Sequence, residues 1–205
     1  MGKTRSLLFV ATSDQLRVAD ALCAVAHGEG YRRLATPIPN GYPRQAFEVR
    51  EWALLPGGDW TVVAPEERDR IFTWGRDASA ALRGTLVVAL TVDPWGDWRA
   101  KAYLDGKPVA KLGDDPDDEF LYPVSRAGER EIQDMERALG WDRLPNHPFR
   151  AWARQLLAGE AKSATSLARA LGTPTPGRSW PELASEPGAV TECWARSDSP
   201  LHHLG

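Results

Sequence analysis

Short apolar runs and alternation of apolar with polar residues dominate the first half of the chain. Residues 6–11 form a continuous apolar run, which is typical of a strand buried on both faces. Residues 86–92 form another such run and predict a central strand. Between residues 98 and 104 the pattern alternates, with small or apolar residues on one face and polar or aromatic residues on the other. These patterns predict a β-sheet.

Turn residues join the predicted strands into two hairpins. The segments 47–55 and 60–64 flank a Pro-Gly-Gly-Asp turn, in which proline sets the first turn angle and glycine accepts a positive φ. Later in the chain, Asp105-Gly106 is a favoured two-residue hairpin turn and leads into residues 108–112. This last segment begins with a proline, which cannot donate to a ladder, so we expect it at an edge of the sheet.

Helical signals follow the first strand and the first hairpin. Thr12 and Gln15 form a capping-box pattern, and apolar residues then recur at helical spacing up to Gly28, where the helix is expected to end. Pro65 suits the first position of a second helix, because the two glutamates after it complement the helix dipole. A further short helix is expected at residues 76–83.

The second half of the chain is predicted to be helical and then irregular. Apolar residues at helical spacing predict helices at 129–139, 147–158 and 163–171. Residues 29–44 and 173–205 are rich in proline and glycine, so we expect a loop and an irregular tail there.

These elements together predict an α/β (α+β) fold, in which a mixed β-sheet carries helices on one face. We expect three parts. Residues 1–113 would form the sheet domain, residues 114–172 a helical cap packed on it, and residues 173–205 the irregular tail.

Composition narrows the possible functions without naming one. The chain of 205 residues contains nine tryptophans, a residue type that suits both cores and recognition surfaces. A net charge of −3 lacks the basic footprint of a nucleic-acid-binding protein. The two cysteines, Cys23 and Cys193, lie far apart, and the apolar run near the N-terminus is too short for a signal peptide or a membrane span. We therefore expect a cytoplasmic protein without membrane contact.

One segment carries a resemblance to known proteins. Residues 86–116 run from an apolar strand through a turn and a tryptophan into Tyr-Leu-Asp-Gly and then Asp-Pro, and Leu171-Gly172 with Trp180 follows near the end. This arrangement resembles a group of uncharacterised bacterial proteins, and the likeness implies a shared fold. As a small α/β protein, the chain is also similar to bacterial immunity proteins, which neutralise toxins by binding them. That likeness implies a protein partner.

The acidic run after residue 113 has three interpretations. Asp114, Asp115, Asp117, Asp118 and Glu119 lie within six residues. They can form a solvated loop that blunts the sheet edge, or a contact surface for a basic partner such as a cationic toxin. Clustered oxygens also suit Ca²⁺ or Mg²⁺, although the spacing and glycine of an EF-hand are missing, so we predict no metal site.

Two further features suggest contact surfaces. Trp95 lies in a predicted turn, where a large indole either faces a partner or folds back over the sheet. Arg99, Lys101 and Tyr103 share one strand face, which Lys111 can join from the neighbouring strand. Such a face can hold single-stranded nucleic acid, but it is also the ordinary solvated side of a half-buried strand.

No catalytic motif is recognisable. The four histidines have no ligand spacing, a Gly-x-Ser-x-Gly elbow is missing, and Cys23 falls on the packed face of a predicted helix. We predict no catalytic residues and no cofactor. The sequence favours a protein-binding module, with an immunity-type partner that acts by blockade as the leading role. Two alternatives stay open: a nucleic-acid-associated protein that uses the Arg99 face, and an enzyme with an unrecognised carboxylate site.

Overall fold

The computed structural model describes residues 5–34, 49–65, 70–93, 98–113 and 180–196, together with Ala151, Gln155 and Arg169. The elements in these ranges are β1 (Arg5–Val10), α1 (Gln15–Gly28), β2 (Tyr31–Arg33), β3 (Arg50–Gly57), β4 (Trp60–Pro65), α2 (Ile71–Ala81), β5 (Val87–Val92), β6 (Trp98–Leu104), β7 (Lys107–Gly113), α6 (Trp180–Ala184) and β8 (Val190–Arg196).

The eight described strands form one sheet in the order β2-β8-β3-β4-β1-β5-β6-β7. The expected α+β class is confirmed. The expectation of a mixed sheet is wrong, because every strand pair within the described ranges is antiparallel. Hairpins join β3 to β4 and β6 to β7, which are antiparallel neighbours. Helix α1 connects β1 to β2, and α2 connects β4 to β5. The two strands of each of these pairs run in the same direction but are not neighbours in the sheet, so no parallel pair results.

The local turn signals predicted the hairpins well. Asp105 and Gly106 have φ values of 51° and 74°, as the tight turn between β6 and β7 requires. Gly58, at φ 66°, turns β3 into β4. The expected turn was too long, because Pro56 and Gly57 belong to β3 and lie opposite Thr61 and Trp60. The proline-bearing strand β7 lies at one edge of the sheet, and β5 lies between β1 and β6 in its interior, both as expected.

Both long helices begin later than expected. The side chain of Asp14, and not that of Thr12, caps α1 by accepting a hydrogen bond from the Arg17 amide at 3.0 Å. The Thr12 hydroxyl instead accepts one from the Asp14 amide. Pro65 ends β4 and does not start a helix, and α2 begins at Ile71 and also covers most of the further short helix that was expected at residues 76–83.

The largest error of the sequence analysis concerns the region expected to be irregular. Strand β8 lies in the interior of the sheet, between β2 and β3, and the short helix α6 precedes it. Strand β2 falls within the stretch expected to be a loop. Residues 192–195 of β8 are all buried, so this strand lacks the alternation that would have marked it in the sequence, and proline and glycine residues precede it.

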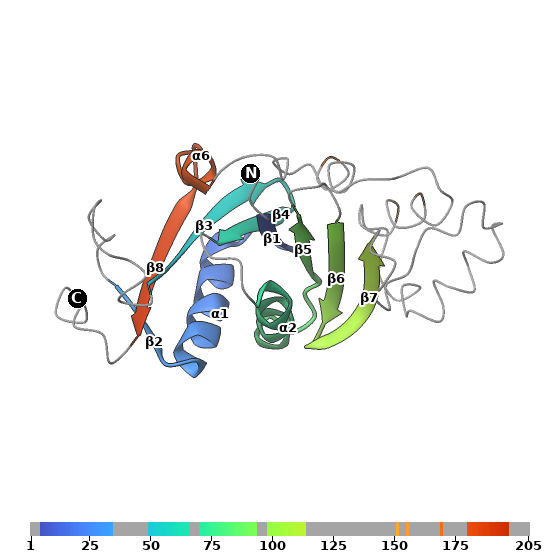
Figure 1. Ribbon diagram of the computed structural model, residues 1–205, viewed down its shortest axis with the longest axis horizontal. Coiled ribbons are helices and arrows are strands. Elements are labelled where there is room, and N and C mark those ends of the chain that lie inside the picture. The colour runs from blue at the N-terminus through green and yellow to red at the C-terminus, as the bar shows by residue number, and fades with distance from the viewer. Residues whose placement is uncertain are drawn as a thin grey trace.

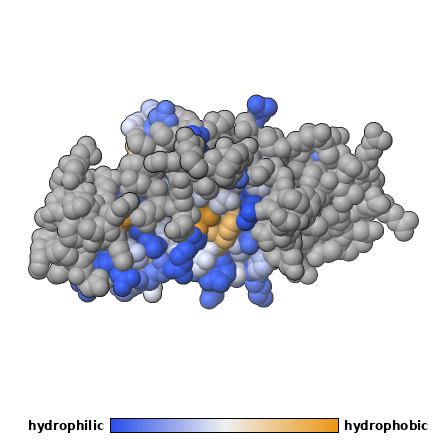
Figure 2. Space-filling model, viewed as in Figure 1, coloured by the Kyte–Doolittle hydropathy of each residue, from blue (hydrophilic) through white to orange (hydrophobic). Residues whose placement is uncertain are grey.

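The sheet curves around α1 and α2, which lie side by side on one face, while α6 contacts β3 and β4 from the other side (Figure 1). Helix α1 packs on β2, β3 and β8, and α2 packs on β1, β5, β6 and β7. Strands β1, β3, β4 and β5 bury residues on both faces. In the view of Figure 2 the described surface is mostly hydrophilic, with a small apolar area near its centre.

The expected helical cap lies outside the described residues, apart from Ala151, Gln155 and Arg169, which are helical and fall within two of the three predicted helices. Among the described helices, none has the length and apolar character that crossing a membrane requires.

Candidate functional site

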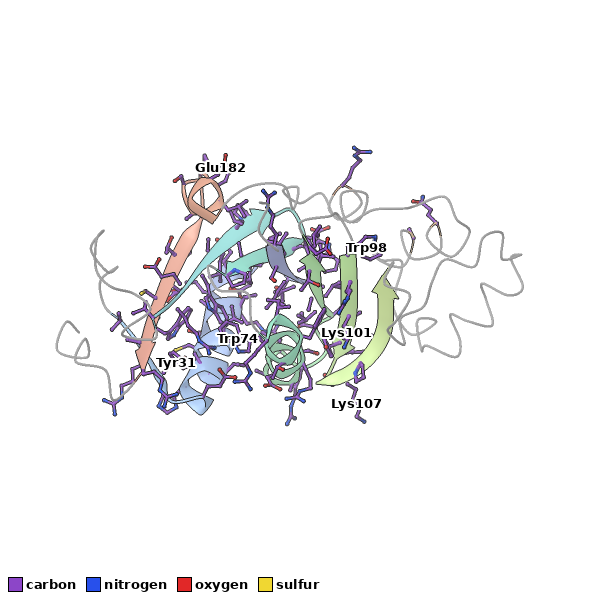
Figure 3. All side chains as sticks on the ribbon, in the orientation of Figure 1. Tyr31, Trp74, Trp98, Lys101, Lys107 and Glu182 are labelled. Atoms are coloured by element: carbon purple, nitrogen blue, oxygen red, sulfur yellow. The ribbon has the colours of Figure 1, made fainter. Side chains whose placement is uncertain are left out.

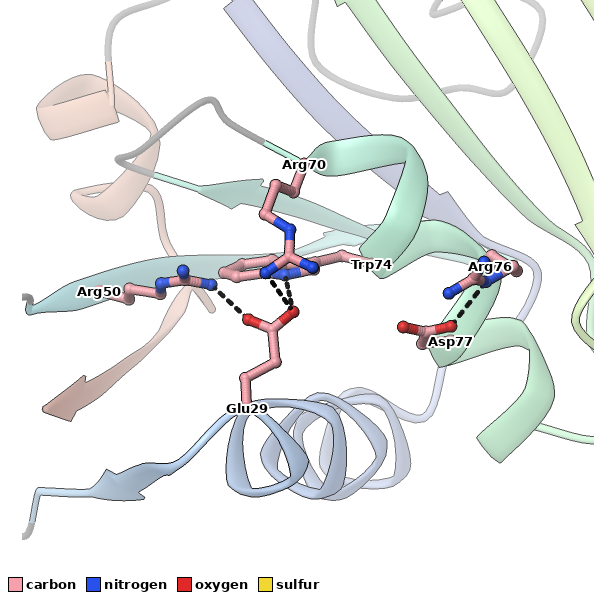
Figure 4. A network of polar contacts seen from close by, with 6 residues as sticks. All are labelled: Glu29, Arg50, Arg70, Trp74, Arg76 and Asp77. Atoms are coloured by element: carbon pink, nitrogen blue, oxygen red, sulfur yellow. Dashed lines mark hydrogen bonds and ion pairs between the residues drawn. The ribbon is translucent and has the colours of Figure 1, made fainter. Parts of the chain in front are cut away.

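Glu29 lies where α1 ends, and the chain turns sharply after it. Its backbone amide closes the helix by donating to carbonyls of the last turn, and Gly30 follows at φ 86°. A left-handed conformation of this kind suits glycine, so the chain leaves the helix here and enters β2. This turn directs the Glu29 side chain between α1 and α2 (Figure 4).

Three nitrogen atoms from two other segments converge on the Glu29 carboxylate (Figure 4). Arg50 Nη1 of β3 donates to Oε2 at 2.9 Å. Arg70 Nη1, just before α2, lies 3.1 Å from Oε1, and Trp74 Nε1 donates to the same oxygen at 3.3 Å. One carboxylate therefore pairs with two guanidinium groups and an indole N–H.

Aromatic rings hold Arg50 in place. Its Cζ lies 4.3 Å from the ring centroid of Tyr31 and 4.5 Å from that of Trp74, both within cation–π distance. Trp52 continues the stack, with its ring centroid 4.1 Å from that of Trp74 and 4.9 Å from that of Trp194. We call these side chains the arginine–tryptophan cluster; its members are Glu29, Tyr31, Arg50, Trp52, Arg70, Trp74 and Trp194.

The cluster has more positive charge and more donors than its own residues satisfy. Among the described residues of the cluster, two guanidinium groups pair with one carboxylate, which leaves a formal surplus of one positive charge. Arg50 Nε and Trp194 Nε1 are buried donors that have no acceptor within the described part of the chain. They belong to residues directly opposite each other on β3 and β8. Arg70 reaches solvent, with 55% of its side chain exposed.

Strands β3 and β8 also carry one buried carboxylate each, Glu51 on β3 and Glu192 on β8. The Cys193 thiol donates to Glu51 Oε1 across β3 and β8, with sulfur and oxygen 3.7 Å apart. Glu192 pairs with Arg33 of β2. Because side chains alternate along a strand, Glu51 and Cys193 point to the sheet face opposite Arg50 and Trp194, so they do not belong to the arginine–tryptophan cluster.

The expected basic strand face is solvated at Arg99, half-buried at Lys101 and buried at Tyr103. Tyr103 is 5% exposed and packs under α2 against Gly75, so the interpretation of this face as solvated is wrong at that residue. Burial raises the pKa of Tyr103 to about 12. Lys101 lies 4.8 Å from the Phe72 ring, Arg99 is exposed, and Lys111 lies opposite Lys101 in the register. Figure 3 shows Lys101 on the other side of α2 from Tyr31.

The other predicted contact residues lie outside the described ranges: Trp95, Asp114, Asp115, Asp117, Asp118 and Glu119. Across the residues that are described, no three histidine, cysteine, aspartate or glutamate side chains come together as a metal site.

Sequence reasoning missed the arginine–tryptophan cluster. Glu29, Arg50 and Arg70 come from a helix end, a strand start and the residue before a helix, at separations that match no motif. One weak signal was present: the unusual number of tryptophans. Arg70 itself adopts φ 74°, a conformation that is uncommon for a residue other than glycine.

The structure defines an α+β protein with a large antiparallel sheet and a partly buried cluster of arginine and aromatic side chains at one end of α1. Comparison by sequence finds similarity to mammalian proteins named L-aminoadipate-semialdehyde dehydrogenase-phosphopantetheinyl transferase. The protein of Rattus norvegicus is 31% identical over 133 residues, which are 59% of this chain and 39% of that protein. The Homo sapiens protein is 32% identical over 108 residues, 47% of this chain and 35% of that protein.

The similarity is therefore partial, since the matched region spans less than two fifths of the relatives' length. No family model matches the chain, and no solved structure does.

Proposed function

We propose that this protein is a protein-binding module that holds an anionic group of its partner at Arg50 and Arg70. The observation that carries the proposal is the positive surplus of the arginine–tryptophan cluster, in which two arginines share the single carboxylate of Glu29. Guanidinium groups bind carboxylates and phosphates through paired hydrogen bonds, which supply geometric specificity as well as energy.

The two arginines suit different steps of binding. Arg50 is 14% exposed and stacked between two rings, so little side-chain freedom is lost when an anion contacts it. Arg70 is largely exposed and can meet an approaching partner first.

The proposal includes the contacts expected from the sequence. Trp95 would anchor the partner, and the acidic run at 114–119 would meet basic groups on it, so that the interface carries both signs of charge. An immunity-type role, in which binding blocks the partner, fits such a surface. We place this role in the cytoplasm, supported by the Cys193 thiol, which bonds to Glu51 and forms no disulfide.

Charge reversal tests the proposal with a matched control on the same helical segment. Arg70 and Arg76 are 55% and 53% exposed, but Arg76 pairs with Asp77 and lies outside the cluster. Affinity capture with the wild-type chain is expected to retain a stoichiometric protein partner. Arg70→Glu should lose that partner and Arg76→Glu should keep it. Equal retention by both variants, or capture of nucleic acid alone, would contradict the proposal.

A second candidate is phosphopantetheinyl transfer, which the named relatives favour through 31–32% identity over about half of this chain. Its substrate would be anionic as well, so the two arginines could contact the phosphoryl group. Incubation with coenzyme A and an acyl carrier protein tests this candidate. Covalent addition of phosphopantetheine, detected by mass spectrometry and lost in Arg50→Ala, would support transfer, and an unmodified carrier protein would exclude it for that acceptor.

A further inference from the structure

We infer that Glu29 fills a binding site for a phosphomonoester, and that the phosphoryl group of the partner displaces it from Arg50, Arg70 and Trp74. The inference rests on the proposed function and names the chemical group that the site recognises. Glu29 then acts as an internal substitute for the ligand, because its carboxylate presents two oxygens where phosphoryl oxygens would lie.

The geometry around Glu29 is that of an occupied oxyanion site. Nitrogen atoms of a strand residue, a loop residue and a helix residue lie within 3.3 Å of its two oxygens. These nitrogen atoms come from two segments that are distant in the sequence. The Arg50 guanidinium is already held in position by its stacking on the rings of Tyr31 and Trp74. Once Glu29 has moved away, donors placed by a strand and a helix can receive another oxyanion with little change in their own positions.

The charge balance favours a phosphomonoester over a second carboxylate. A carboxylate supplies one negative charge and leaves the surplus of the two guanidinium groups in place. A phosphomonoester carries about 1.5 to 2 negative charges near neutral pH and three acceptor oxygens. With the Glu29 carboxylate turned out into water, it can therefore neutralise both arginines and also accept from the indole N–H of Trp74.

The position of Glu29 makes it easy to displace. It lies at the carboxyl end of α1, where the helix dipole is negative and disfavours a carboxylate. Its side chain is 18% exposed, so it has a route to water. An incoming phosphoryl group would lie near the same helix end, so its binding would depend on the two guanidinium groups and the indole N–H that Glu29 gives up.

Removing the charge of Glu29 without changing its size gives the sharpest test. Calorimetric titration with inorganic phosphate should show about tenfold tighter binding to Glu29→Gln than to the wild type, the effect of losing one competing ion pair. Arg70→Ala should abolish binding. Asp77→Asn is the matched control, because it removes one carboxylate that pairs with an arginine outside the cluster, and its affinity should equal that of the wild type.

The outcomes decide the inference in either direction. An equal gain in Glu29→Gln and Asp77→Asn would reduce the effect to net charge and overturn it, as would phosphate binding that Arg70→Ala does not change. Failure of both the wild type and Glu29→Gln to bind phosphate would also overturn it. If Glu29→Gln does not fold, Glu29→Asp, which has a shorter reach to the same donors, should show a smaller gain, and no gain would count against displacement.

Two ligand arms distinguish a phosphoryl group on a protein from a free phosphate. A peptide with one phosphoserine should bind Glu29→Gln more tightly than inorganic phosphate does if the source is a protein, and the same peptide with glutamate at that position should bind more weakly. Equal affinity of phosphopeptide and inorganic phosphate would indicate a small-molecule source. Partner capture that is lost in Arg70→Glu, without any phosphate binding, would leave the proposed function standing and remove only this inference.

Discussion

Helices α1 and α2 cover neighbouring halves of one sheet face, but the two halves are packed with different chemistry. Under α2 the backbone of Gly75 approaches the sheet so closely that a Cβ there would lie 3.0 Å from the Ala89 Cβ. Beside α1 the space holds Trp52, Trp194 and the guanidinium of Arg50. Trp74 of α2 joins the two halves by stacking on Trp52.

The difference separates residues that specify the fold from residues that are available for binding. Small residues permit close contact of helix and sheet, and such contacts are sensitive to a single added methyl group. A large aromatic cluster with a buried cation leaves donors such as Arg50 Nε and Trp194 Nε1 without acceptors in the described part of the chain, which costs stability. We therefore expect function beside α1 and structural specificity under α2.

The largest expected effect follows removal of the central ring of the cluster. Trp52 is 1% exposed and stacks on both Trp74 and Trp194. Trp52→Ala should lower the free energy of unfolding by about 3 to 5 kcal/mol, because it removes a buried ring and leaves a cavity. Urea unfolding, followed by circular dichroism, measures the change.

A control on the same half of the molecule completes this test. Leu16 of α1 is 72% exposed, so Leu16→Ala should change the free energy of unfolding by no more than about 0.5 kcal/mol. A loss of less than about 1 kcal/mol in Trp52→Ala would mean that the cluster contributes little to stability, and the contrast between the two halves would have to be redrawn.

Local signals explain why half of this fold was predictable. The Asp105-Gly106 turn and the alternation at β6 are encoded within adjacent residues, and strand β6 was predicted with the bounds that the structure has. The start of α1 was misplaced because Asp14 and Thr12 both suit a cap, and only the folded backbone decides which side chain meets the Arg17 amide.

Long-range pairing explains why the rest was not predictable. Strand β8 pairs with β3, more than a hundred residues earlier in the chain, and nothing in residues 190–196 indicates that partner. The arginine–tryptophan cluster depends on this pairing, because Arg50 and Trp194 become neighbours only across it. A site assembled from separate segments leaves no spacing pattern in the sequence.

A smaller effect is expected from adding one methyl group under α2. In Gly75→Ala the new Cβ would lie 3.0 Å from the Ala89 Cβ and 3.3 Å from Leu8 Cδ2. Overpacking of this kind costs about 1 to 3 kcal/mol. Alanine is favoured over glycine in a helix by about 1 kcal/mol, so we expect a net loss of stability that reaches about 2 kcal/mol at most. Thermal unfolding should show a lower midpoint.

The same substitution at the end of α1 should act in the opposite direction. A Cβ at Gly28 would meet no atom within 4 Å, and the residue is helical, so Gly28→Ala should stabilise the protein by about 0.4 to 1 kcal/mol. If Gly75→Ala proved as stabilising as Gly28→Ala, close packing would not distinguish the α2 half.

The smallest expected effect on the free energy of unfolding near neutral pH comes from Tyr103. This effect becomes larger only at alkaline pH. Burial raises its pKa to about 12, and Arg76 opposes part of that increase. In the unfolded chain a tyrosine has a pKa of about 10. A group whose pKa is raised by folding contributes its full stability below the unfolded value, so the wild type should lose stability as pH rises from about 10 through about 12.

Tyr103→Phe cannot ionise and should lose less stability over that pH window, since the lysines titrate alike in both proteins. Urea unfolding of the two proteins at a series of alkaline pH values measures the difference. Parallel curves would mean that water reaches the Tyr103 hydroxyl, and that the α2 half is less tightly closed than its packing indicates.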